Sequence, residues 1–253
     1  MSNIEHGKRL VDIRTVKVLG LPVGAFIDRH SFPGYYEQDK IGIKNANEIL
    51  ETEDLLIFDA HRFKTDVLAA GAVTSQVINA STLIVPAAIY LYEKQFSRKL
   101  IEEVGKLEGV EICWVGRKQD MEKGGRRDIK KKISREKARS LATEFFKKID
   151  QIRGKPHCAA FIAPYGSREL YRTEVKQGVR RALRNGSPAI CTYAVWNRHE
   201  KIYYVMFSSN VLRFSPDASD KEIDKAVDIE YELLEQRENY YKNKPSSDYF
   251  SEI

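Results

Sequence analysis

The sequence predicts an α/β fold: a mostly parallel sheet flanked by helices, with an antiparallel hairpin in the C-terminal half. Apolar runs of strand length alternate with helical patterns along the first half, which favours parallel strands joined by right-handed crossovers. The run LLIF at 55–58 is apolar on both faces, as a central parallel strand should be. Two further apolar runs, 189–196 and 202–207, are separated only by a short polar segment, which indicates the hairpin.

The first half supplies most of the expected parallel strands. The stretch 97–107 reads as a helix because Leu100, Ile101, Val104 and Leu107 follow the i, i+3, i+4, i+7 spacing, and Gly109 ends it. In this half we expect strands at 15–28, 55–58, 82–90 and 110–115, and helices at 44–51, 65–78 and 97–107.

The second half begins after a polar stretch rich in glycine and arginine. We expect a long basic helix at 128–153, a strand at 158–163, a helix at 168–184, the hairpin, an acidic helix from Ser219 or Asp220 to Glu238, and a polar tail at 240–253. The segment Asn185-Gly186-Ser187-Pro188 ends the expected helix 168–184. The chain therefore divides into an α/β half (1–116), a basic linker and helix (117–155) and a second α/β half (156–253). The two halves either share one sheet or form two lobes.

Composition restricts the class of protein. The chain has 253 residues, of which 42% are hydrophobic, enough to bury a sizeable core. No apolar run reaches the roughly 18–20 residues that a membrane helix needs, and the first ten residues, MSNIEHGKRL, lack the apolar core of a secretory signal. Cys113, Cys158 and Cys191 each sit in an apolar run and are expected to be buried in a reducing compartment. We therefore expect a cytoplasmic protein without membrane contact.

The positive charge is concentrated in one segment. Residues 117–155 hold 15 Lys and Arg against 6 Asp and Glu, a net charge of +9, whereas the rest holds 27 against 30, a net charge of −3. Such concentration is typical of a protein that binds nucleic acid, DNA or RNA, through phosphate contacts, here by Arg126, Arg127 and Lys131. The alternative is a solvated helix whose charges have no ligand.

Two apolar runs end in the same polar pattern. The first, FIDRH at 26–30, and the second, IFDAHR at 57–62, each place an Asp at the strand end, a His two residues later and an Arg beside that His. Sites in parallel sheets form outside the carboxyl ends of the strands. Carboxylates there suit Mg²⁺ or Mn²⁺, which activates water for phosphodiester cleavage. The roles predicted are metal binding for Asp28 and Asp59, catalysis by these two with His30 and His61, and phosphate binding for Arg29 and Arg62, with Asp66 and Glu93 as possible further ligands.

The echo between these two runs also has a purely structural explanation. Strands often end in Asp because it favours turns, and His30 precedes Ser-Phe-Pro-Gly, a turn sequence. The metal site therefore requires that Asp28 and Asp59 share one edge of the sheet.

A second group of basic residues recurs every four positions in the expected helix 168–184. Arg168, Arg172, Lys176, Arg180 and Arg184 form a ridge that borders the apolar face and can contact phosphates. At its start, Tyr165-Gly166-Ser167 offers backbone N–H groups to an anion. A basic amphipathic helix without a ligand is the alternative. The tripeptide Glu174-Val175-Lys176 matches the E-x-K of metal-dependent nucleases, but the pattern places it within a helix, whereas those enzymes carry it on a strand.

These patterns predict a hydrolase that acts on nucleic acid, a nuclease dependent on Mg²⁺ or Mn²⁺. One alternative is a non-catalytic protein that binds nucleic acid through the same basic surfaces. Another is an enzyme that acts on a small nucleotide or phosphorylated ligand bound at 165–168. The sequence does not predict an oligomeric state.

Overall fold

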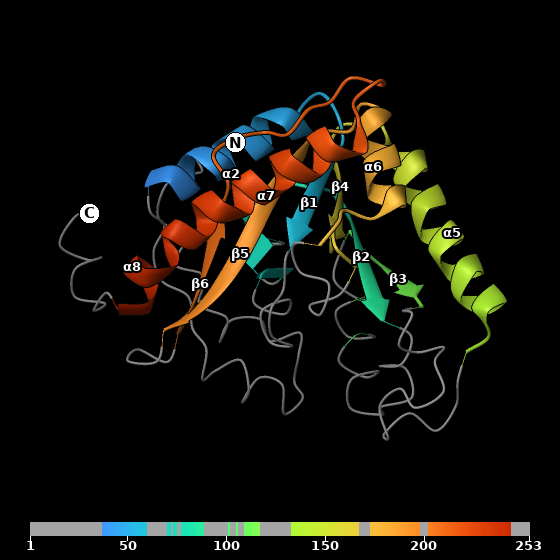
Figure 1. Cartoon of the computed structure of the whole chain (residues 1–253), viewed down its shortest axis with the longest axis horizontal. Helices are drawn as coiled ribbons and strands as arrows, with labels where there is room; N and C mark the ends of the chain where they lie inside the picture. The colour runs from blue at the N-terminus through green and yellow to red at the C-terminus, as the bar shows by residue number, and fades with distance from the viewer. Residues whose placement is uncertain are drawn as a thin grey trace.

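The chain forms a six-stranded sheet in the order β3-β2-β4-β1-β5-β6, covered by helices on both faces (Figure 1). The computed structural model describes residues 37–59, 70–71, 73–74, 77–88, 101, 105, 109–116, 133–166, 173–197 and 202–243. The expected strand 15–28 lies outside these residues, as do most of the expected helices 65–78 and 97–107. The prediction of an α/β fold with a mostly parallel sheet is confirmed.

Five of the six strands are parallel. These are β1 (Leu55–Asp59), β2 (Thr82–Ala88), β3 (Val110–Val115), β4 (Cys158–Ile162) and β5 (Ala189–Asn197), and β6 (Ile202–Phe207) returns antiparallel to β5 as the predicted hairpin. Because β4 lies between β2 and β1, and β5 pairs with β1, the strands of the two halves interleave in one sheet. The two-lobe alternative is therefore wrong.

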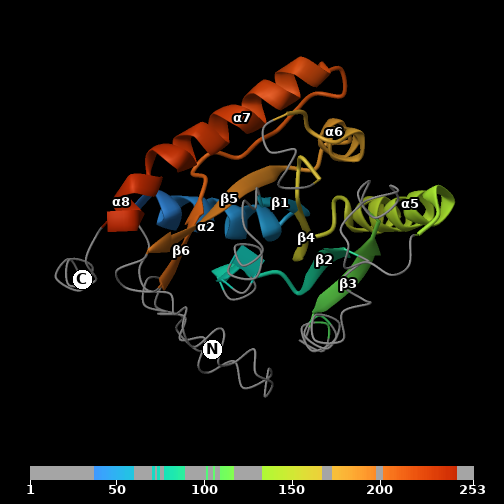
Figure 2. The same ribbon diagram turned by 60° about the horizontal axis from the view of Figure 1, so that its bottom comes forward.

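The helices are α2 (Glu37–Leu50), α5 (Arg135–Ile152), α6 (Gln177–Arg184), α7 (Asp220–Gln236) and α8 (Glu238–Asn243). In Figure 1, α5 lies beside β3 at one end of the sheet, and α7 with α8 lies beside β5 and β6 at the other. The view in Figure 2 shows α7 along the outer margin of the ribbon, with α6 at its N-terminal end. Two hydrophobic clusters separate the helices by face, because α2 packs into one and α5, α6, α7 and α8 into the other.

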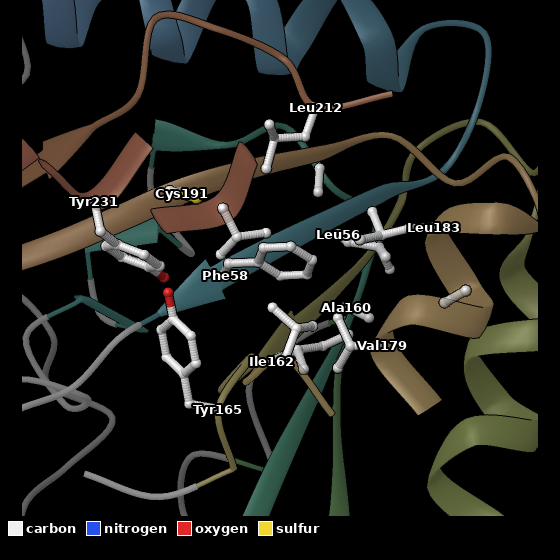
Figure 3. Close-up of a cluster of buried hydrophobic side chains, with 14 of the residues drawn as sticks. Leu56, Phe58, Ala160, Ile162, Tyr165, Val179, Leu183, Cys191, Leu212 and Tyr231 are labelled. Atoms are coloured by element: carbon white, nitrogen blue, oxygen red, sulfur yellow. The ribbon is translucent and has the colours of Figure 1, made fainter. Parts of the chain in front are cut away.

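The buried side chains follow the alternation of the strands. In β1, Leu55 and Ile57 join the cluster under α2, whereas Leu56 and Phe58 join the cluster under the other four helices. Figure 3 shows Leu56 and Phe58 among side chains from β4, α6 and α7. Full burial of a Leu or Phe side chain stabilises the fold by roughly 1.5–3 kcal/mol. The expectation that 55–58 is a central strand buried on both faces is confirmed.

The connections that follow the neighbouring strands β1 and β4 run over opposite faces of the sheet. The connection from β1 to β2 carries helical residues at 70, 71, 73, 74 and 77, of which Ala70 and Val73 pack into the α2-face cluster. The connection from β4 to β5 carries α6, which packs on the other face. Since β1 and β4 are adjacent, their carboxyl ends flank a topological switch point, the place where open α/β sheets bind ligands.

The long basic helix starts later than the sequence indicated. The prediction placed its start at residue 128, but α5 begins at Arg135, and Ser134 caps it by accepting a hydrogen bond from the Lys137 N–H at 3.1 Å. The hydroxyl satisfies one of the N–H groups that have no partner within the helix, which fixes the start there. The buried face of α5 carries Ala138, Leu141, Phe145, Ile149 and Ile152.

The helix that carries the predicted basic ridge is also shorter than expected. Its N-cap is Lys176, in an extended conformation, and α6 begins at Gln177. The prediction of a helix from 168 is therefore wrong for 173–176, which are not helical. The N–H of Val175 donates to the Asp224 carboxylate of α7 at 3.2 Å, and that of Lys176 to the Pro164 carbonyl at 2.9 Å. Contacts with other segments thus replace the helical hydrogen bonds that the spacing predicted.

The expected polar tail begins inside a helix. Tyr241 of α8 is buried, its hydroxyl donates to the Asp39 carboxylate of α2, and its carbonyl accepts from the Asn197 amide at 2.8 Å. Asp39, also buried, accepts from the Phe207 N–H at 2.7 Å and from Arg237 at 2.8 Å. These contacts hold α8 against the sheet. They also explain why α2 starts at Glu37 and not near residue 44, since its first turn carries the carboxylate.

Candidate active site at the carboxyl edge of the sheet

Asp59 is the last residue of the central strand β1 and lies beside the switch point. Its neighbour across the β1–β5 ladder is Thr192, and both side chains fall on the α2 face, in line with Ile57 and Ile190. Thr192 is buried and donates its hydroxyl to the Phe58 carbonyl at 3.1 Å. Asp59 itself is 1% exposed. The central strand therefore delivers a buried carboxylate to the edge where ligands bind in such sheets.

The chain leaves β4, on the other side of the switch point, through the turn Ala163-Pro164-Tyr165-Gly166. The Gly166 N–H donates to the Ala163 carbonyl at 3.0 Å, and Gly166 has a φ of +81°, a conformation that favours glycine. Tyr165 is buried, and its hydroxyl donates to the Asp228 carboxylate of α7 at 2.5 Å. Figure 3 shows its hydroxyl and that of Tyr231 directed toward one another. Tyr165 thus anchors the turn to α7.

Lys176 lies across this turn. A Cβ atom at Gly166 would fall 2.9 Å from the Lys176 Cε and 3.3 Å from its Cγ, so the lysine stem packs directly on the glycine. The backbone N–H of Lys176 holds the same turn through the Pro164 carbonyl. Among the described residues, no ion pair involves the Lys176 ammonium. The turn after β4 therefore carries a positive charge that no described carboxylate neutralises.

The arginines that follow Lys176 have carboxylate partners instead. Arg180 donates through Nε and Nη2 to both oxygens of Asp224, at 3.0 and 2.5 Å, and through Nη1 to Asp220 at 3.0 Å. Arg184 donates to Asp220 and to the Ala218 carbonyl. We call Arg180, Arg184, Asp220 and Asp224 the α6–α7 charge cluster. The Arg184 hydrogen bond, with Gln177 and Arg180 nearby, lowers the pKa of Asp220, and the hydrogen bond to Asp224 raises the pKa of Arg180.

Arg180 is buried as well as paired, so its charge serves the contact between α6 and α7. The phosphate-binding role predicted for it gains no support from this geometry. Lys176 keeps that role as a prediction. The ridge of basic residues expected every four positions is interrupted, because Lys176 precedes the helix and Arg180 faces inward.

Most of the other predicted site residues lie outside the described residues. Asp59, Lys176 and Arg180 are described. The site residues outside are Asp28, Arg29, His30, His61, Arg62, Arg126, Arg127, Lys131, Arg168 and Arg172, and the possible ligands Asp66 and Glu93 are outside as well. Whether Asp28 shares the edge with Asp59 stays a prediction.

Within the described ranges, no group of three or more His, Cys, Asp or Glu side chains could hold a metal ion. Asp59 therefore supplies one carboxylate, and the further ligands of a cation would come from outside those ranges. The hydroxyl of Thr192 lies next to Asp59 but donates to a backbone carbonyl. In the same ranges, no helix is long and apolar enough to cross a membrane.

The helix α5 carries the described part of the basic segment. Arg135, Lys137, Arg139 and Lys147 are exposed on it. Lys148 pairs with Glu111 of β3, and Asp150 pairs with Arg181 at 3.0 Å and Arg153 at 3.8 Å. The end of α5 near β4 is thus neutralised in part, and its N-terminal half presents basic side chains to solvent.

Sequence reasoning missed two contributors to this edge. Thr192 sits inside an apolar strand, and its pairing with Asp59 depends on the register of two strands more than 130 residues apart. Asp228 holds Tyr165 from α7, a helix whose acidic residues read as solvent-exposed. A Thr in an otherwise apolar parallel strand was the one available signal.

No family model matches the chain, and neither the curated proteins nor the solved structures compared with it include a match.

Proposed function

We propose that the chain is a divalent-metal-dependent hydrolase that cleaves phosphodiester bonds in nucleic acid at the carboxyl edge of the sheet. The observation that supports this most directly is the position of Asp59, a buried carboxylate at the end of the central strand and beside the β1–β4 switch point. A carboxylate in that position is suited to hold a hard cation.

In this proposal Asp59 and Asp28 hold Mg²⁺ or Mn²⁺. Such a cation, when bound, lowers the pKa of a water and stabilises charge on the phosphoryl oxygens. His30 and His61 transfer protons at the attacking and leaving oxygens. The Lys176 side chain, whose stem packs on the Gly166 turn, contacts the phosphate through its ammonium from the β4 side, with Arg29, Arg62, Arg168 and Arg172 as further phosphate ligands.

A polymeric substrate is favoured by positive charge beyond Asp59 and Lys176, on α5 at the β3 end of the sheet. The exposed basic side chains of α5 and the strongly basic stretch that precedes it would track a phosphate backbone over several nucleotides. Arg126, Arg127 and Lys131 belong to that stretch. The three cysteines are free thiols, which favours the reducing cytoplasm as the place of action.

The direct test is cleavage of plasmid DNA and of RNA with Mg²⁺, with Mn²⁺ and with EDTA. We expect cleavage that requires the cation and that Asp59→Asn lowers by at least 10²-fold, while nucleic-acid binding is retained. Asp217→Asn, at an exposed carboxylate after β6, is the matched control and should cleave like the wild type. Absence of cleavage with either nucleic acid and either cation would contradict the proposal.

A non-catalytic nucleic-acid-binding protein is the second candidate. The observation that favours it is the 1% exposure of Asp59, which leaves the carboxylate little contact with solvent. This candidate predicts binding that weakens steeply with salt, no cleavage, and no effect of Asp59→Asn on affinity.

A further inference from the structure

The helices α7 and α8 carry exposed apolar side chains. Ile229, Leu233 and Tyr240 are 42%, 43% and 39% exposed, and they account for three of the four large exposed hydrophobic side chains among the described residues. Tyr240 belongs to α8, and at 100° per residue Ile229 and Leu233 fall about 40° apart around the axis of α7. In Figure 2 this helix forms the outer margin of the ribbon, away from the sheet.

Charged and polar side chains accompany Ile229 and Leu233 on α7 in a self-complementary order. Glu222, Lys225, Glu232 and Gln236 are exposed and recur at helical spacing on the same side as Ile229. Lys225 lies four residues before Ile229, and Glu232 and Leu233 lie three and four residues after it. Glu222 and Gln236 are each seven residues from Ile229.

A two-fold axis through Ile229 makes this order complementary to itself. Two antiparallel copies of α7 would place the two Ile229 side chains in contact, Lys225 of each copy beside Glu232 and Leu233 of the other, and Glu222 of each copy opposite Gln236 of the other. Lys225 and Glu232 project to the same side of the helix, so a two-fold axis perpendicular to the helices keeps them together. Among the exposed side chains of this face named above, no two like charges fall opposite one another in this register.

We propose that the outer face of α7 is the contact surface of a homodimer, in which two copies of the chain pair antiparallel about Ile229. The contact is isologous, as two-fold symmetry requires, with an apolar centre and two charge pairs. One helix face is a small interface, so the dimer is weak and forms at high protein concentration. This surface of α7 faces away from the sheet. A homodimer formed there does not depend on the proposed catalytic function.

The test is the mass of the full chain by sedimentation equilibrium, from about 10 µM to about 1 mM. We expect a monomer–dimer equilibrium that shifts at least tenfold toward monomer in Ile229→Asp, because two carboxylates would meet at the axis. Ile41→Asp, at a similarly exposed position on α2, is the matched control and should dimerise like the wild type. Circular dichroism checks that both variants stay folded, as surface changes should.

A charge exchange tests the register itself. Lys225→Glu and Glu232→Lys should each weaken the dimer, and the double variant should restore it, because the pairs form again with reversed sign. A wild-type chain that is monomeric over the whole range overturns the proposal, even if this face binds another protein. Ile229→Asp with wild-type dimerisation, or a double variant no stronger than the single ones, overturns it too.

Discussion

The α6–α7 charge cluster and the turn after β4 both carry basic residues from the same stretch of sequence, yet they use their charge differently. In the cluster, Arg180 and Arg184 donate to Asp220 and Asp224, and Arg180 is buried. At the turn, Lys176 packs its stem on Gly166, and its ammonium takes part in none of the ion pairs between described residues. Residues with equal spacing in the sequence therefore differ in the structure: the arginines join two helices, and Lys176 has no ion-pair partner among the described residues.

Asp39 is a fully buried carboxylate that forms an ion pair with Arg237. It accepts hydrogen bonds from Tyr241, from Arg237 and from the Phe207 N–H, and so connects α2, β6 and the C-terminal helices. Burial raises the pKa of Asp39, while Arg237 and these hydrogen bonds oppose the rise.

The largest expected effect is that of removing Asp39. Asp39→Ala leaves the Arg237 guanidinium and the Phe207 N–H buried without this acceptor, which should lower the free energy of unfolding by about 3–5 kcal/mol. Tyr241→Phe removes one hydrogen bond and should cost about 1 kcal/mol. Urea unfolding monitored by circular dichroism measures both. Equal effects of the two changes would mean that the ion pair adds nothing to the network.

Arg180 should have the next largest effect. Arg180→Met keeps the apolar stem and removes the fork that holds Asp220 and Asp224, so we expect a loss of about 2–3 kcal/mol. The loss is smaller than at Asp39 because both carboxylates are partly exposed and regain water. Nucleic-acid affinity at fixed salt should not change while the protein is folded. A drop in affinity as large as that of a phosphate ligand would return Arg180 to the binding surface.

The contrast also shows what the sequence could predict. The apolar runs of the sequence predicted the strands at 55–58, 110–115 and 202–207, because a strand bounded by turns is recognisable from its own residues. The start of α6 could not be predicted, since it depends on Asp224 and Pro164, which hold 175 and 176 from other parts of the chain. Lys176 and Arg180 also follow the same four-residue spacing, so the sequence predicted one role for both. Their environments differ because the carboxylates of α7 bind Arg180.

Glu230 of α7 is a second buried carboxylate, with fewer described hydrogen-bond donors around it than Asp39. It accepts from the Asn210 amide at 2.9 Å, and burial raises its pKa, against that hydrogen bond and Arg237. A raised folded-state pKa means that stability contributed by this group is present below the unfolded pKa and is lost as pH rises through the folded one. Glu230→Gln should therefore stabilise the protein by about 1 kcal/mol near pH 8 and little near pH 4. Unfolding curves at both pH values check this, and a gain that is equal at both would exclude the titration of Glu230 as its cause.

The smallest effect on stability is expected at Lys176. This residue also distinguishes the turn after β4 from the α6–α7 charge cluster most directly. Lys176→Gln keeps most of the stem over Gly166 and removes a charge without a described ion-pair partner, so the free energy of unfolding should change by less than about 0.5 kcal/mol. Binding should respond instead. If the ammonium contacts a phosphate, the slope of log K against log salt for DNA or RNA should fall by about one unit. Lys176→Arg should retain most of that slope.

The matched control is Lys221→Gln, which removes the same charge from the exposed first turn of α7 and should leave the slope unchanged. If Lys176→Gln and Lys221→Gln lower the slope equally, the net charge of the protein is what matters, and the turn after β4 has no special role. If neither changes the slope but Lys176→Gln destabilises the fold, the ammonium belongs with the arginines of the α6–α7 charge cluster. A change in the slope for Lys176 alone, with stability intact, separates the two regions and places the phosphate next to Gly166, at the β4 side of the edge that Asp59 occupies.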